Sequence, residues 1–151
     1  MAGTGMPAST AEELAHEFLR VIQRKDIDAM CALLADDFTL EVPYNRSGTN
    51  DLSDSWHGPA AARENFLRVW REMIDVVEYA MIEVTPARDP NIAFAETLGD
   101  MRMFNGNPYR NRYVFRFDCM DGRIRRLSEY ANPASSLLAW GMALGDPEPD
   151  A

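Results

Sequence analysis

The sequence predicts a single α+β domain in which a strongly bent sheet, antiparallel or mixed, packs on three N-terminal helices. Three observations predict this class. Helical patterns occupy the first half of the 151-residue chain, long runs of alternating apolar and polar residues occupy the second, and Asn105-Gly106 and Asp121-Gly122 separate those runs as hairpin turns. Strands of ten or more residues twist and bend, so a sheet backed by helices encloses a concave space.

Three helices are expected in the first half of the chain. The first extends from about Thr10 to Arg24, because Thr10 and Glu13 have the spacing of a capping box and apolar residues follow at helical intervals. Asp26 can cap a second, short helix. Gly58-Pro59 begins a third helix. Its apolar face carries Phe66, Val69, Trp70 and Met73.

The strands are predicted from their alternating patterns. Residues 38–44 alternate up to Pro43, which cannot donate to a ladder and therefore lies at an edge or an end of the sheet. Residues 45–56 are rich in Asn, Ser, Gly and Asp and predict a long loop. A short helix is expected over 134–142. Before it, strands are expected over about 76–85, 92–104, 109–119 and 123–130.

Composition fits one globular domain and disfavours several classes of function. Hydrophobic residues make up 46% of the chain and charged residues 26%, so residues 10–143 can form one core between flexible termini at 1–9 and 144–151. The formal net charge of −9 disfavours nucleic acids and anionic membrane surfaces as partners. The two cysteines form no C-x-x-C pair and no apolar stretch has the length of a membrane span, so a cytoplasmic location is expected.

No cofactor or metal is expected. His16 and His57 lie far apart, and no Cys/His cluster, Gly-rich phosphate loop or dinucleotide motif occurs in the sequence. His57 titrates near neutral pH and precedes a predicted helix, so it is a candidate pocket residue, with a loop or cap contact as the alternative.

Alternation along residues 109–119 predicts which side chains line the concave space. One face carries Tyr109, Asn111, Tyr113, Phe115 and Phe117. This face must be covered, because four exposed rings would form a large hydrophobic patch on the surface. Asn111 lies on the same face and therefore needs a polar partner. Tyr44 and Asn45 follow the first strand and are candidates for a phenol and an amide at the pocket mouth, although a simple strand-ending turn is the alternative.

Two glutamates are candidate acid–base groups. Glu96 falls on the predicted apolar face of the strand over 92–104, where desolvation would raise the pKa of its carboxyl group and suit proton transfer near neutral pH. The alternative is a structural carboxylate paired with Arg112 or Arg102. Glu129 lies on the last strand, whose two faces both carry apolar residues, so periodicity leaves its orientation open.

Short stretches in both halves of the chain match a known pattern. The first half has Lys25–Met30, Leu34–Phe38 and Trp56-His57-Gly58, which resemble the nuclear transport factor 2-like superfamily. That superfamily includes ketosteroid isomerases, SnoaL-like polyketide cyclases and limonene epoxide hydrolases. The second half is most similar to the phenazine-biosynthesis A/B proteins. Its matching stretches are Asp89-Pro90-Asn91, Ala95-Glu96, Tyr109 with Asn111, residues 121–124 and residues 128–133.

The resemblance implies a cone-shaped, cystatin-like α+β barrel with a pocket between sheet and helices, and a homodimer formed through the sheet. It also implies that Glu129 faces inward as the acid, because the phenazine proteins and the epoxide hydrolases both keep a carboxylate at that place. The Arg–Asp pair of the epoxide hydrolases has no counterpart in residues 96–100, and the pocket histidine of the phenazine proteins has none in residues 63–66.

The expected function is cofactor-independent isomerase, cyclase or dehydratase chemistry on a small hydrophobic carbonyl-bearing metabolite, such as one of secondary metabolism. Glu129 and Glu96 would share proton transfer. The alternatives are a non-catalytic ligand-binding or scaffold protein of the same fold, which paired glutamates would favour, and a small epoxide hydrolase. The residues expected to contact the ligand are Tyr44, Asn45, His57, Trp70, Asn111, Tyr113 and Phe115.

Overall fold

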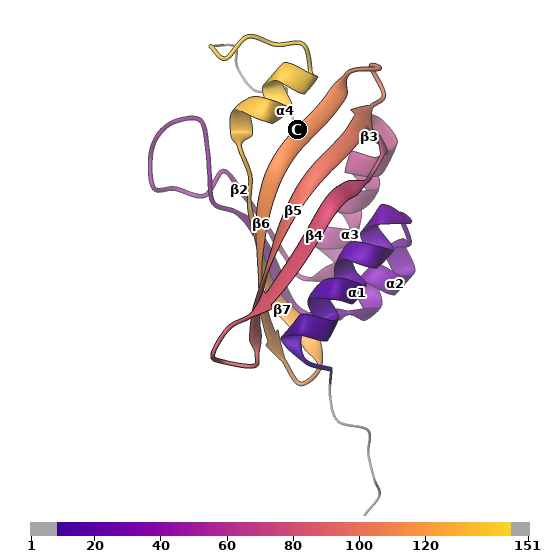
Figure 1. Ribbon diagram of the computed structural model, residues 1–151, viewed down its shortest axis with the longest axis vertical. Coiled ribbons are helices and arrows are strands. Elements are labelled where there is room, and N and C mark those ends of the chain that lie inside the picture. The colour runs from indigo at the N-terminus through magenta and orange to yellow at the C-terminus, as the bar shows by residue number, and fades with distance from the viewer. Residues whose placement is uncertain (1–8, 146–151) are drawn as a thin grey trace, which may run out of the picture.

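The computed structural model describes residues 9–145, in which a curled sheet wraps against helices (Figure 1). Most of the termini expected to be flexible, 1–9 and 144–151, therefore lies outside the described residues. The helices are α1 (Ala11–Gln23), α2 (Ile27–Ala32), α3 (Pro59–Arg68), the π-helical turn η1 (Val69–Met73) and α4 (Pro133–Ala139). The strands are β1 (Leu34–Val42), β2 (Asp54–His57), β3 (Ile74–Val76), β4 (Tyr79–Pro86), β5 (Ile92–Met103), β6 (Pro108–Met120) and β7 (Arg123–Tyr130).

The sheet is mixed and strongly curled. Its strands follow the order β2-β1-β7-β6-β5-β3, with β4 also paired to β5. The pairing of β1 with β7 is parallel, and the other pairings are antiparallel. Figure 1 shows α1, α2 and α3 together on one face of the sheet and α4 at one end of it. The predicted fold class, a strongly bent antiparallel or mixed sheet on three N-terminal helices, is confirmed, and the parallel pair makes the sheet mixed.

Helix α1 closes one end of the space inside the sheet. The predicted capping box is present, since the Thr10 side chain accepts from the Glu13 N–H and the Glu13 carboxylate accepts from the Thr10 N–H. Phe18 is fully buried and its ring packs edge-on against Phe117 of β6, with centroids 5.6 Å apart. Ile22, near the C-terminal end of α1, lines the space that remains open. The core therefore lies under the middle of α1 and the cavity beyond its end.

Two strand predictions differ from the structure. Asp54–His57 forms β2, which pairs with β1 and overlaps the end of the segment predicted as a loop, because four residues are too few to show a clear alternation. The strand predicted over 76–85 is divided into β3 and β4, which pair with different parts of β5.

The predicted orientation of β5 is wrong, and with it the inward position of Glu96. Glu96 lies on the outer face of the sheet, where Arg112 donates to its carboxylate at 2.5 Å. The first four inward residues of β5 are small: Ala93, Ala95, Thr97 and Gly99. They are small because the aromatic side chains of β6 already fill the interior opposite them.

The register between β5 and β6 places small residues of β5 opposite large aromatic residues of β6. Ala93 lies opposite Phe117, Ala95 opposite Phe115 and Thr97 opposite Tyr113. At Gly99 even a methyl group would clash, because a Cβ there would lie 2.8 Å from Cε2 of Tyr113. Apolar content alone therefore misidentified the buried face, since over residues 92–99 the larger apolar residues, such as Phe94 and Leu98, lie on the outer face, and large inward residues follow only at Met101 and Met103.

Candidate functional site

A cavity of about 300 Å³ lies between the concave face of the sheet and α3, and a second space of about 310 Å³ adjoins it beneath α4. We call them the inner lobe and the outer lobe. Both are lined by Val42, Ser53, Arg68, Met73, Tyr109, Glu129, Ser136 and Trp140. The inner lobe adds Ile22, Leu40, Asp54, Trp56, Asn65, Phe66, Val69, Trp70, Ile74, Val77, Tyr79, Met101, Met103 and Tyr113. The outer lobe adds Tyr44, Glu72, Asn111, Ala131, Asn132, Pro133 and Leu137.

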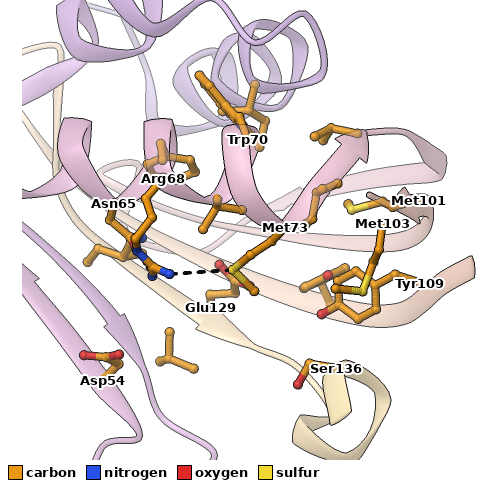
Figure 2. Close-up of a pocket in the computed structure, with 18 of the residues that line it drawn as sticks. Asp54, Asn65, Arg68, Trp70, Met73, Met101, Met103, Tyr109, Glu129 and Ser136 are labelled. Atoms are coloured by element: carbon orange, nitrogen blue, oxygen red, sulfur yellow. Dashed lines mark hydrogen bonds between the residues drawn. The ribbon is translucent and has the colours of Figure 1, made fainter. Parts of the chain in front are cut away.

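Glu129 lies where the two lobes meet (Figure 2). It faces inward from β7, opposite Phe115 of β6, which answers the question that periodicity left open. Its carboxyl group makes no hydrogen bond and no ion pair with any residue in the range 9–145. Burial away from water raises the pKa of this carboxyl group from 4.5 to about 7. At neutral pH Glu129 can therefore both accept and donate a proton.

Three tyrosines surround the Glu129 carboxyl group. Burial raises the pKa of the hydroxyls of Tyr79, Tyr109 and Tyr113, and negative charge on Glu129 raises each of them further. The ring of Tyr113 stacks on that of Phe115, with centroids 5.4 Å apart, which fixes its direction. These phenols remain protonated around neutral pH, so they can donate hydrogen bonds to an oxygen atom of a ligand.

Asn111 has the polar partners that its inward position required. Its side-chain nitrogen donates to the backbone oxygen of Asn132 at 3.0 Å and to the hydroxyl of Tyr109 at 3.2 Å. Its side-chain oxygen accepts from the backbone N–H of Asn132 at 3.0 Å. Asn111 therefore fixes the chain entering α4 and orients Tyr109, and its amide is already engaged at the position where it was expected to bind a ligand carbonyl.

We expect Asn111→Ala to lower the free energy of unfolding by about 1 to 3 kcal/mol, because the buried Asn111 side chain is removed together with its two part-buried hydrogen bonds to the backbone of Asn132. Urea unfolding followed by circular dichroism measures the change. The matched control is Asn45→Ala, which alters an exposed loop amide whose bonds water can replace, with an expected change within about 0.5 kcal/mol. Equal losses in both variants would contradict the structural role of Asn111.

Helix α3 and the turn η1 form the wall opposite the sheet. The π-helical turn brings Trp70 and Met73 to the inner lobe, and π-turns of this kind often occur at functional sites. Lys25 fixes the turn, because its ammonium group donates to the backbone oxygens of Ile74 at 3.0 Å and Asp75 at 2.7 Å. Figure 2 shows Asn65, Arg68 and Trp70 projecting from this wall.

The residues predicted to contact the ligand are distributed unevenly around the cavity. Trp70 and Tyr113 line the inner lobe and are almost fully buried. Tyr44 lies at the edge of the outer lobe, with 57% of its surface exposed, and packs against Tyr130. Phe115 stands behind Tyr113 and supports it without lining either lobe.

Asn45, His57 and Glu96 do not line either lobe, which corrects their predicted position. Asn45 organises its own loop by donating to the backbone oxygen of Asp51 at 2.6 Å. His57 is exposed at the end of β2, with Thr39 Oγ1 at 3.4 Å from its Nδ1 atom. In the part of the chain that the structure describes, no three His, Cys, Asp or Glu side chains gather to hold a metal ion. No helix within 9–145 is long and apolar enough to cross a membrane.

Sequence reasoning missed several lining residues. Tyr79 follows the break between β3 and β4, which was predicted as one strand, so its direction was not deduced. Asn65 and Arg68 have the i, i+3 spacing that places two side chains on one face of a helix, and this signal was available. Ser136 and Trp140 come from the region of α4, whose position over the cavity only the tertiary structure reveals.

The chain is similar to a known protein family and to several solved structures. A family model described as SnoaL-like domain matches residues 15–127. A proposed isomerase from Bacillus subtilis is 25% identical, with a TM-score of 0.75 over 88% of this chain and 94% of that one. A proposed polyketide cyclase from Pseudomonas putida is 21% identical, with a TM-score of 0.73 over 90% and 100%. A phenazine biosynthesis-related protein from Pseudomonas aeruginosa is 20% identical, with a TM-score of 0.72 over 93% and 86%. At these identities the two Pseudomonas proteins share the fold alone.

Proposed function

Because the chain belongs to the SnoaL-like domain family, we propose that it is a small-molecule enzyme that uses Glu129 for acid–base chemistry on a hydrophobic, carbonyl-bearing metabolite. The observation that carries the proposal is the setting of Glu129: a carboxyl group without a protein partner in the described range, with a pKa near 7, among neutral phenols in a mostly apolar cavity. Carboxylates with raised pKa values are typical of acid–base sites. The proposed chemistry requires no cofactor.

The proposed reaction begins with ionised Glu129. The carboxylate removes a proton from the carbon beside the carbonyl group, and the electron pair of that C–H bond moves to the carbonyl oxygen. The hydroxyls of Tyr109 and Tyr113, which remain protonated, donate hydrogen bonds to the enolate oxygen. Where the substrate also carries a C=C bond conjugated with the enolate, return of the proton from Glu129 to the far carbon of that bond reforms the carbonyl, shifts the double bond and completes an isomerisation. Alternatively, attack of the enolate carbon on a second carbonyl carbon of the same molecule forms a C–C bond and an alkoxide, which takes the proton back from Glu129 and completes a cyclisation.

The reaction class has two sources of support. The description of the Bacillus subtilis protein, at 25% identity, as a proposed isomerase agrees with proton transfer at carbon. The second source is the difference in pKa between the one carboxyl group and its three phenol neighbours. The carboxyl group can move a proton near neutral pH, while the phenols keep theirs and can donate hydrogen bonds to the substrate. The earlier expectation that Glu96 shares the proton transfer is not retained, because Glu96 pairs with Arg112 on the outer face of the sheet.

Exchange of carbon-bound hydrogen with solvent tests the proposal directly. Cyclic ketones and enones of one or two rings are incubated with the protein in D₂O, and deuterium at the carbon beside the carbonyl is measured by NMR. We expect enzyme-dependent exchange for compounds that fit a cavity of about 300 Å³. Binding of these compounds without exchange would favour the non-catalytic alternative. Diol formation from a small epoxide would instead favour the hydrolase alternative.

We also propose that two copies associate through the outer face of the sheet. Phe94 and Val114 are more than one third exposed there, beside Arg112 and Arg116. We expect Val114→Glu to convert a dimer into a monomer, because a charge would be placed in the apolar part of the contact. Sedimentation velocity measures the state. A monomeric wild-type protein, or a variant that stays dimeric, would contradict the proposal.

A further inference from the structure

Arg68 is a cation of the cavity wall that forms no ion pair with a carboxylate of residues 9–145. It lies in the last turn of α3, is half-buried, and lines both lobes. One end of its guanidinium group donates to Oδ1 of Asn65 at 3.0 Å, and the other approaches the sulfur of Met73 at 3.7 Å (dashed line in Figure 2). Both partners are neutral.

Most arginines within 9–145 pair with an acid, and Arg68 is one of the few that do not. The formal net charge is −9, and arginines elsewhere on the described surface commonly pair with acids, as Arg112 does with Glu96 and Arg125 with Asp37. Of the acids that line the cavity, none within 9–145 forms an ion pair with Arg68. These acids are Asp54, Glu72 and Glu129.

A half-buried cation is stabilised when an anion pairs with it. The described residues provide no such anion for Arg68, so a ligand can provide it. The planar guanidinium group matches the two oxygens of a carboxylate and can donate two parallel hydrogen bonds to them. A dianionic phosphate fits less well, because the cavity offers it one arginine and exposes it to the acids Asp54 and Glu72. The charge pattern therefore favours a singly charged carboxylate.

We propose that Arg68 binds a carboxylate group of the ligand, so that the substrate class is a ring compound carrying both a carbonyl and a carboxylate. The ring would occupy the inner lobe against Trp70 and Tyr113, and the carboxylate would lie at Arg68, where the lobes meet. The carbonyl group in this substrate class rests on the proposed function. The anion site itself rests on Arg68 alone.

Binding of matched probes tests the anion site without any turnover. The probes are 2-naphthoate, 2-naphthamide and 2-naphthyl phosphate, and calorimetric titration gives their dissociation constants. We expect the wild-type protein to bind the carboxylate at least about 10-fold more tightly than the amide, because two charge-assisted hydrogen bonds are gained. Equal affinities for these two probes, or tightest binding of the phosphate, would overturn the proposal.

Three variants assign the preference to Arg68. Arg68→Gln should erase it and Arg68→Lys should retain part of it, with melting temperatures confirming that both fold. The matched control is Arg71→Gln, which changes an exposed arginine one turn along that donates only to the backbone oxygen of Leu67, and should leave the preference intact. A preference that survives in Arg68→Gln would overturn the assignment.

The same titration separates this inference from the proposed function. Glu129→Gln should keep the preference for the carboxylate probe, since Glu129 forms no ion pair with Arg68. If Glu129→Gln also kept full exchange activity, the proposed chemistry would fail while the anion site stood. If the preference were absent and exchange still depended on Glu129, only the anion site would fail.

Discussion

Glu129→Gln is expected to slow hydrogen exchange and turnover at least about 100-fold while leaving the fold intact. General acid–base catalysis by one positioned side chain contributes roughly 10²- to 10⁴-fold, and an amide of nearly the same shape can neither take up nor return the proton. The measurement is the initial rate of deuterium incorporation at pH 8, with near-ultraviolet circular dichroism to confirm the native packing of the aromatic side chains around the cavity.

The sequence contains a matched control for this variant. Glu96→Gln makes the same chemical change on the outer face of the sheet, where the carboxylate pairs with Arg112, and it should leave the rate unchanged. A fully active Glu129→Gln protein would remove Glu129 from the mechanism. Similar losses in both variants would point to a general effect on the protein instead of the loss of a catalytic group.

The pH dependence of the rate follows from the proposed role as a base. Only ionised Glu129 can remove the first proton, and burial raises its pKa to about 7. The value of kcat/KM should therefore be level at high pH and fall as the pH drops below 7. An ordinary exposed glutamate would show this fall near pH 4.

Features that are local in the sequence were predicted well. The capping box of Thr10 and Glu13 begins α1, and the hairpin turns at Asn105-Gly106 and Asp121-Gly122 join β5 to β6 and β6 to β7, because each depends on a few neighbouring residues. The inward face of β6 was also predicted, since its aromatic residues leave one consistent choice. Which face of β5 points inward was not predicted, because it depends on the volume of residues such as Phe117 on the next strand.

The candidate site was predicted in part for the same reason. Trp70 and Tyr113 lie on patterned faces and line the cavity, whereas the orientation of Glu129 was inferred only from the resemblance, not from the strand itself. Arg68 and Tyr79 come from segments that meet only in the folded chain. The missing acid partner of Arg68 could not be deduced from sequence, because it is a fact about distances between several elements.

Glu129→Gln is also expected to be more stable than the wild-type protein at pH 8, by about 3 kcal/mol, and nearly equal to it at pH 4. The native pKa of Glu129, about 7, lies above its ordinary value of 4.5, so the folded protein holds a proton that the unfolded chain releases between these values. Wild-type stability therefore falls as the pH rises through this window. Glutamine has no proton to release and avoids the loss. Urea unfolding at several pH values measures the difference between the two proteins.

This stability experiment needs no substrate, which makes it decisive for the site itself. The control is again Glu96→Gln, whose exposed ion pair contributes about 1 kcal/mol or less, and which should show no gain that grows with pH. A gain for Glu129→Gln that grows between pH 5 and pH 7 means that the cavity keeps a carboxyl group away from water at a cost in stability. Such a cost is typical of functional sites, whereas a difference that is constant with pH would leave Glu129 an ordinary carboxylate and remove the basis for its proposed role.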